Sequence, residues 1–131
     1  MDQGPLVMQQ IDAGARFVRE FAKYTPLQSA FWLKGTADNE WYLYVAGDQI
    51  NDSNFAVAYG EVTRITTKIP DPWLDPFQIK VVGASKPVAK AVLQIQEQYP
   101  GMLPTRYHGP PLGGLCIEEV YIYPLSISVP A

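Results

Sequence analysis

Two apolar runs, residues 27–33 and 41–47, stand close together in the chain, and a short polar segment separates them. Both runs are rich in aromatic and aliphatic residues, which favour strands, and residues 35–39 between them contain glycine, aspartate and asparagine. This pattern predicts a β-hairpin with its loop at residues 35–39. Because neither run alternates cleanly between apolar and polar residues, both faces of the hairpin require a cover of helices or of a second subunit.

The position of the loop sets the expected pairing of the two strands. The expected pairs are Lys34–Glu40, Leu33–Trp41, Trp32–Tyr42, Phe31–Leu43 and Ala30–Tyr44. Residues that pair across a hairpin point to the same face of the sheet. Phe31 and Trp41 are therefore expected on one face, and Trp32 and Tyr44 on the other.

Three segments repeat apolar residues at the three- and four-residue spacing of an amphipathic helix. They are residues 6–24, 55–69 and 88–99. Thr25-Pro26 should end the first helix, because the residue before a proline is pushed out of the helical region. The polar residues 51–54 suit the start of the second helix, where their side chains could accept hydrogen bonds from free amides.

Two further strands are expected, at residues 77–83 and 115–123, with at most a short extended piece between 102 and 114. The predicted order is α-β-β-α-β-α-(β)-β, which indicates a single α/β domain over residues 1–131, with α+β as the alternative class. Right-handed crossovers would make the second, third and final long strands parallel and leave the first strand antiparallel. The expected sheet is therefore mixed, with four or five strands opened by the hairpin.

A single hydrophobic core is expected from the central apolar positions of these elements. The residues assigned to it are Phe31, Leu43, Val62, Ile79, Val81, Ile95 and Ile117.

The composition narrows the classes of function. The chain has 131 residues, a formal net charge of −3 and a pI near 5.0, which argues against a broad surface for nucleic acid or anionic membrane. Cys116 is the only cysteine and His108 the only histidine, so an internal disulfide and a multi-His or multi-Cys metal site are excluded. No cofactor or metal is expected. The sequence shows no signal peptide and no apolar run long enough to span a bilayer, so a cytoplasmic location is expected.

The most site-like stretch is residues 105–108, directly before a run of glycine and proline. Arg106 supplies a charge and His108 a titratable group, and glycine lets a backbone approach a ligand closely. Glu118 and Glu119 follow on the final strand, where neighbouring side chains point to opposite faces and cannot act as one acid/base pair. These four residues are weak catalytic candidates, and each also has a simpler structural explanation as a loop or paired residue.

Chemistry-bearing residues are therefore sparse, whereas aromatic residues are abundant. Those expected to form an interface are Trp32, Tyr42, Tyr44, Tyr121 and Tyr123. We expect a small non-catalytic domain that forms a homodimer and acts through protein contacts, because such an aromatic patch usually marks an interface. The alternative is a small enzyme or ligand-binding domain with a pocket at the loop of Arg106 and His108.

Overall fold

The computed structural model describes residues 6–35, 40–98, 105–107 and 117–124. The helices and strands follow the predicted order. They are α1 (Met8–Tyr24), β1 (Ser29–Gly35), β2 (Trp41–Gly47), α2 (Phe55–Lys68), the 3-10 turn η1 (Pro76–Gln78), β3 (Ile79–Gly83), α3 (Pro87–Gln98), β4 (Thr105–Tyr107) and β5 (Ile117–Ile122). The α/β class with a mixed sheet is therefore confirmed.

The described strands form one sheet in the order β3-β2-β1-β5-β4. β2 and β3 are parallel, and β1 is antiparallel to both β2 and β5. β2, β3 and β5 therefore run in one direction, as right-handed crossovers predict. β4 pairs antiparallel with β5 and is the short extended piece expected before the final strand.

The hairpin forms, but its predicted register is wrong by one residue. Lys34 pairs with Trp41 rather than with Glu40, and Leu33 pairs with Tyr42. A shift of one residue turns every side chain of one strand to the other face relative to its partner. Trp32 therefore shares a face with Leu43, and Phe31 stacks on Tyr44 with ring centroids 5.1 Å apart.

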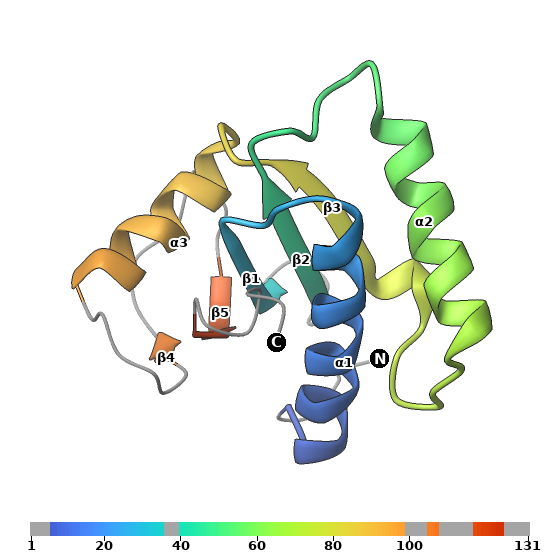
Figure 1. Cartoon of the computed structure of the whole chain (residues 1–131). Helices are drawn as coiled ribbons and strands as arrows, with labels where there is room; N and C mark the ends of the chain where they lie inside the picture. The colour runs from blue at the N-terminus through green and yellow to red at the C-terminus, as the bar shows by residue number, and fades with distance from the viewer. Residues whose placement is uncertain (1–5, 36–39, 99–104, 108–116, 125–131) are drawn as a thin grey trace.

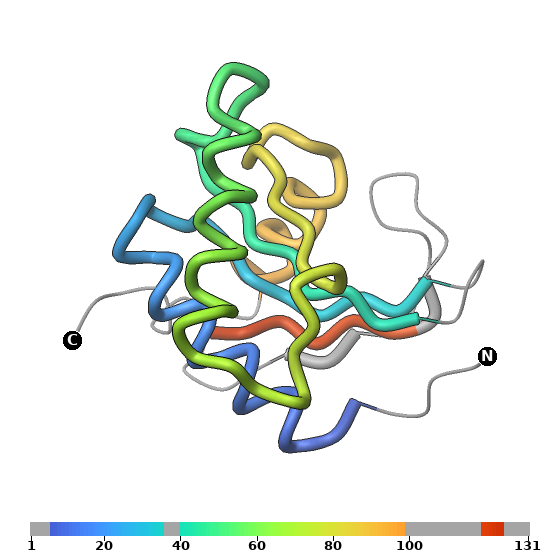
Figure 2. Tube along the Cα trace, turned by 90° about the vertical axis from the view of Figure 1, so that its right-hand side faces the viewer, coloured from blue at the N-terminus to red at the C-terminus, as the bar shows by residue number. Residues whose placement is uncertain are grey.

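Helices cover both faces of the sheet (Figure 1). On one face, α1 and α2 lie over Trp32, Leu43 and Val45. Figure 2 views the molecule from the side of α2, with α1 at the lower left of the picture. On the other face, α3 packs on Phe31 and Leu33. The buried residues form two separate clusters, so the prediction of a single core is wrong.

The two faces are covered because the chain crosses the sheet in both directions. From β2 it passes through α2 to β3 at the edge, and from β3 it returns through α3 to β4 and β5 beyond β1. Crossovers of one hand that move in opposite directions place their helices on opposite faces. Among the described residues, helices therefore cover both faces of the sheet, whereas the predicted dimer requires one aromatic face to be uncovered.

Local contacts modify two predicted element ends. Asn54 precedes α2, but its side-chain oxygen accepts a hydrogen bond from the Asn51 amide at 2.9 Å and caps no amide of the helix. β3 begins at Ile79 rather than at residue 77, because Asp75 accepts a hydrogen bond from the Phe77 amide and starts η1. Phe77, the first residue of the predicted strand, therefore lies outside it.

Candidate functional site

Three of the four predicted catalytic candidates lie along β4 and β5. Arg106 is in β4 opposite Tyr121, and Glu118 and Glu119 are in β5. Glu119 is half-buried and stands opposite Lys34, so two opposite charges face each other across neighbouring strands, which stabilises a sheet. His108 lies outside the described residues, as does the glycine- and proline-rich run after it. The pocket at this loop stays a prediction.

Of the predicted interface aromatics, three lie inside the domain. Trp32 is 0%, Tyr123 3% and Tyr121 7% exposed, because α1 and its neighbours cover them. These three residues cannot form a surface patch on this fold, and their assignment to an interface is corrected here. Tyr42 and Tyr44 are half-buried. The Lys80 ammonium lies 4.9 Å from the centre of the Tyr42 ring, which is a favourable cation–π contact.

The buried aromatics connect the sheet to α1 through two hydrogen bonds. Trp32 Nε1 donates to the Tyr123 hydroxyl at 2.9 Å, and this hydroxyl donates to the Ile11 carbonyl at 2.6 Å. Gly14 leaves room for them, since a Cβ atom there would approach Trp32 Nε1 to 2.8 Å. Burial raises the pKa of Tyr123 well above its usual value. This cluster is structural.

Large apolar side chains are exposed instead along α2 and the segment that follows it. Those with at least a third of their surface exposed in this region are Phe55, Val57, Ile69, Trp73 and Phe77. Phe77 stands out because its side chain is 88% exposed, although phenylalanine is among the residue types that are most often buried. The sequence pattern concealed this residue, because residues 77–83 alternate as a strand with Phe77 on its buried face.

Phe77 borders a groove between α2 and the edge of the sheet. We call the residues that line it the Phe77 surface: Tyr59, Val62, Thr63, Pro76, Phe77, Ile79 and Lys80. The groove has a volume of about 370 Å³. Phe55 extends the surface, since its ring contacts that of Tyr59 with centroids 4.9 Å apart. An exposed phenylalanine ring and an open groove therefore lie side by side on one surface.

The edge strand next to this groove is partly closed to further strands. The Val81 amide donates to the Tyr59 hydroxyl at 3.0 Å, so a side chain occupies a position that an added strand would use. Any partner at the Phe77 surface is therefore expected to contact side chains rather than to extend the sheet.

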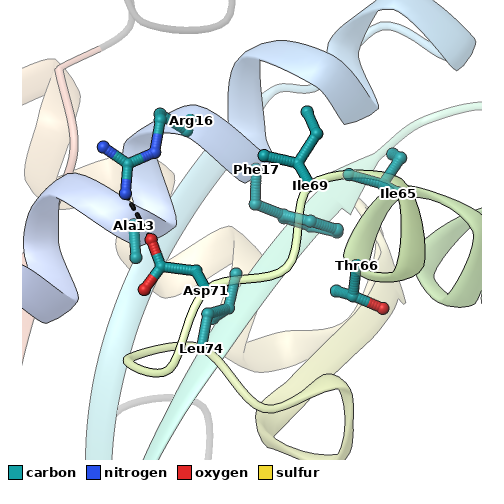
Figure 3. Close-up of a pocket in the computed structure, with 8 residues that line it drawn as sticks. All are labelled: Ala13, Arg16, Phe17, Ile65, Thr66, Ile69, Asp71 and Leu74. Atoms are coloured by element: carbon teal, nitrogen blue, oxygen red, sulfur yellow. Dashed lines mark hydrogen bonds and ion pairs between the residues drawn. The ribbon is translucent and has the colours of Figure 1, made fainter.

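A second pocket, between α1 and the segment after α2, is too small for a ligand (Figure 3). Its volume is about 20 Å³, which is room for about one water molecule. Arg16 and Asp71 form an ion pair at its edge, and most of the other lining residues, including Phe17 and Leu74, are apolar. These contacts hold the segment after α2 against α1, and the pocket is a small gap in their packing.

Comparisons with known protein families, with curated proteins and with solved structures find no match to this chain. Within the described residues, no group of three or more His, Cys, Asp and Glu side chains is placed to hold a metal ion. None of the described helices is long and apolar enough to cross a membrane.

Proposed function

We propose that this protein is a small non-catalytic cytoplasmic domain that acts through self-association and protein contacts, and that the Phe77 surface is its contact site. The observation that carries the proposal is the 88% exposure of Phe77 beside a groove of about 370 Å³. An exposed aromatic next to a hollow is typical of an interface anchor and its pocket. The single cysteine of the chain agrees with a reducing compartment.

The shape of the surface favours a second copy of the same chain as the partner. In a two-fold dimer the same patch meets itself, so each Phe77 ring can enter the groove of the other subunit. An exposed ring and a groove on one surface therefore favour a second copy as the partner.

Burial of the two Phe77 rings supplies part of the free energy that a dimer requires. Complete burial of a phenylalanine side chain contributes about 1.5–3 kcal/mol, and a symmetric dimer buries two of them. The surrounding groove residues add apolar area, whereas association costs translational and rotational freedom. A dissociation constant in the micromolar range corresponds to about 8 kcal/mol net, so the groove residues have to supply most of the free energy of such a dimer.

Sedimentation of Phe77→Asp beside the unchanged chain tests the proposal. At concentrations well above a micromolar dissociation constant, the unchanged chain should sediment at twice its mass of 14.6 kDa, and Phe77→Asp at 14.6 kDa. Met8→Asp is the matched control, because Met8 is 65% exposed but does not line the groove, and it should leave the dimer intact. Thermal unfolding of both variants should show that the fold is retained. An unchanged chain that is still monomeric at about 100 µM would refute the proposal, as would a dimer that survives Phe77→Asp.

A further inference from the structure

The topology of the sheet creates a crevice at one end of β2 and β3. These two strands are adjacent and parallel, and the chain leaves β2 towards α2 on one face and β3 towards α3 on the other (Figure 1). The loops after two such strands diverge, and α/β proteins bind ligands in the crevice that opens there, outside the carboxyl ends of the strands. The crevice follows from the strand order and does not involve Phe77.

A groove of about 240 Å³ lies at this position. Its lining comes from the loop after β2 with the first residue of α2, and from the loop after β3: Ile50, Asn51, Asp52, Phe55, Gly83, Ser85 and Lys86. The volume is below the range of about 300–1,000 Å³ that is typical of drug-sized ligands, so the groove suits a compact molecule.

Hydrogen bonds connect the two loops that form the walls of this groove. The Gly47 carbonyl accepts hydrogen bonds from the Ile50 amide at 3.3 Å and from the Ala84 amide at 3.0 Å, which joins the two loops at their bases. Gly83 lets the loops meet, because a Cβ atom at this position would approach the Ile50 carbonyl oxygen to 2.9 Å. The groove is therefore preformed, which lowers the entropic cost of binding.

The side chains around the groove combine one positive and one negative charge with polar and apolar groups. Lys86, Ser85 and Asp52 are exposed, and none of the three side chains has a hydrogen bond or ion pair among the residues that the structure describes. Lys86 and Ser85 can donate to an anionic group, and Asp52 can accept from a hydroxyl or ammonium group. The Phe55 ring, 39% exposed, offers an apolar surface between them.

We propose that this crevice binds a small organic anion, a carboxylate or a phosphate, that also carries a hydroxyl or amino group on a short body. Lys86 pairs with the anion and Asp52 with the hydroxyl or amino group. The two charges on the protein lie on the two different loops, so a ligand with both groups can span the groove. A ligand that has the anion alone uses one wall and binds more weakly.

Amide NMR spectra of the full chain, titrated with two anionic probes, test this site. The probes are phenyllactate, a hydroxy-carboxylate, and phosphoethanolamine, an amino-phosphate, and 3-phenyl-1,2-propanediol is the uncharged comparison. Saturable shifts are expected at residues 50–55 and 83–86 for at least one anion, and the responding probe identifies the anionic group. Lys86→Gln should weaken binding about tenfold, the loss of one charge-assisted contact.

Lys90→Gln is the matched control, because Lys90 is an exposed lysine one turn further along α3 that does not line the groove. This variant should bind the responding probe as the unchanged chain does. The spectrum of each variant without probe checks that the fold is retained. Three results would overturn the proposal: no saturable shift with either anion, equal binding of the uncharged diol, or an affinity unaffected by Lys86→Gln.

Discussion

Replacing Tyr123 by phenylalanine removes a single hydroxyl group that connects the sheet to α1. This hydroxyl accepts a hydrogen bond from Trp32 Nε1 at 2.9 Å and donates one to the Ile11 carbonyl at 2.6 Å. Both Trp32 and Ile11 are buried, with exposures of 0% and 6%, so water cannot easily replace the lost partner. The ring itself stays in place, and the change therefore isolates the two hydrogen bonds.

The expected loss follows from what remains unpaired. A buried donor without a partner costs about 1–3 kcal/mol, and this applies in full to the Trp32 indole N–H. The loss at Ile11 is smaller, because a carbonyl within a helix also accepts from the amide four residues on. We expect a total of about 2–3 kcal/mol, which for a chain of this length lowers the melting temperature by about 7–11 °C.

Urea denaturation followed by tryptophan fluorescence measures this loss as a free energy of unfolding. Tyr24→Phe is the matched control, because Tyr24 is 38% exposed and its hydroxyl makes no hydrogen bond among the described residues. The control should change the free energy of unfolding by less than about 0.5 kcal/mol. If Tyr123→Phe changed it no more than Tyr24→Phe does, the proposed connection between α1 and the sheet would be wrong.

Three further predictions concern stability. Gly14→Ala should lower the free energy of unfolding by about 1–3 kcal/mol, because the added Cβ would meet Trp32. Gly60→Ala should raise the free energy of unfolding by about 0.5–1 kcal/mol, because the space around Gly60 is open and alanine favours a helix. Equal urea midpoints for the two variants would contradict this. The pKa of Tyr123 is raised in the folded state, so its contribution to stability is complete below its ordinary pKa of 10.0 and declines as the pH rises further. The difference in free energy of unfolding between the unchanged chain and Tyr123→Phe should therefore narrow between pH 9 and pH 11. A constant difference would count against burial of the hydroxyl. Phe31→Ala and Leu43→Ala should each cost about 2–5 kcal/mol, since both side chains are 0% exposed, and chemical denaturation showing under about 1 kcal/mol for either would contradict its place in the core.

Periodicity predicted the helices and strands well because each has a strong local signal. The spacing of Ile11, Val18 and Phe21 is that of the buried stripe of α1, and Thr25 ends the helix before Pro26 as expected. The direction of the strands followed from the handedness of crossovers. These features depend on short stretches of chain or on a general chiral rule, so the sequence was sufficient for them.

The register and the cover of the sheet depend on contacts between distant segments. Both faces of the hairpin are apolar, so moving one strand by a single residue produces an equally plausible pattern, and the sequence could not choose between them. The position of α3 was also undetermined, because it depends on the return of the chain past β1 to β5. The interface aromatics were misassigned for this reason: Trp32 and Tyr123 lie beneath α1.

The surface sites left weaker signals in the sequence. Phe77 alternates with Ile79 and Val81 as a strand residue would, and only the start of η1 at Pro76 turns it outwards. The crevice could have been anticipated, since polar residues follow Gly47 and Gly83 at the ends of two successive strands with parallel direction. Polar residues at 51–54 instead indicate the start of a helix, which is the commoner role of such residues.

The mass of the protein in solution tests the central claim most directly. Sedimentation equilibrium of the unchanged chain and of Phe77→Asp, each from about 1 to 100 µM, should show a concentration-dependent dimer of twice 14.6 kDa for the first and a monomer for the second. A monomer of the unchanged chain across this range would contradict self-association through the Phe77 surface.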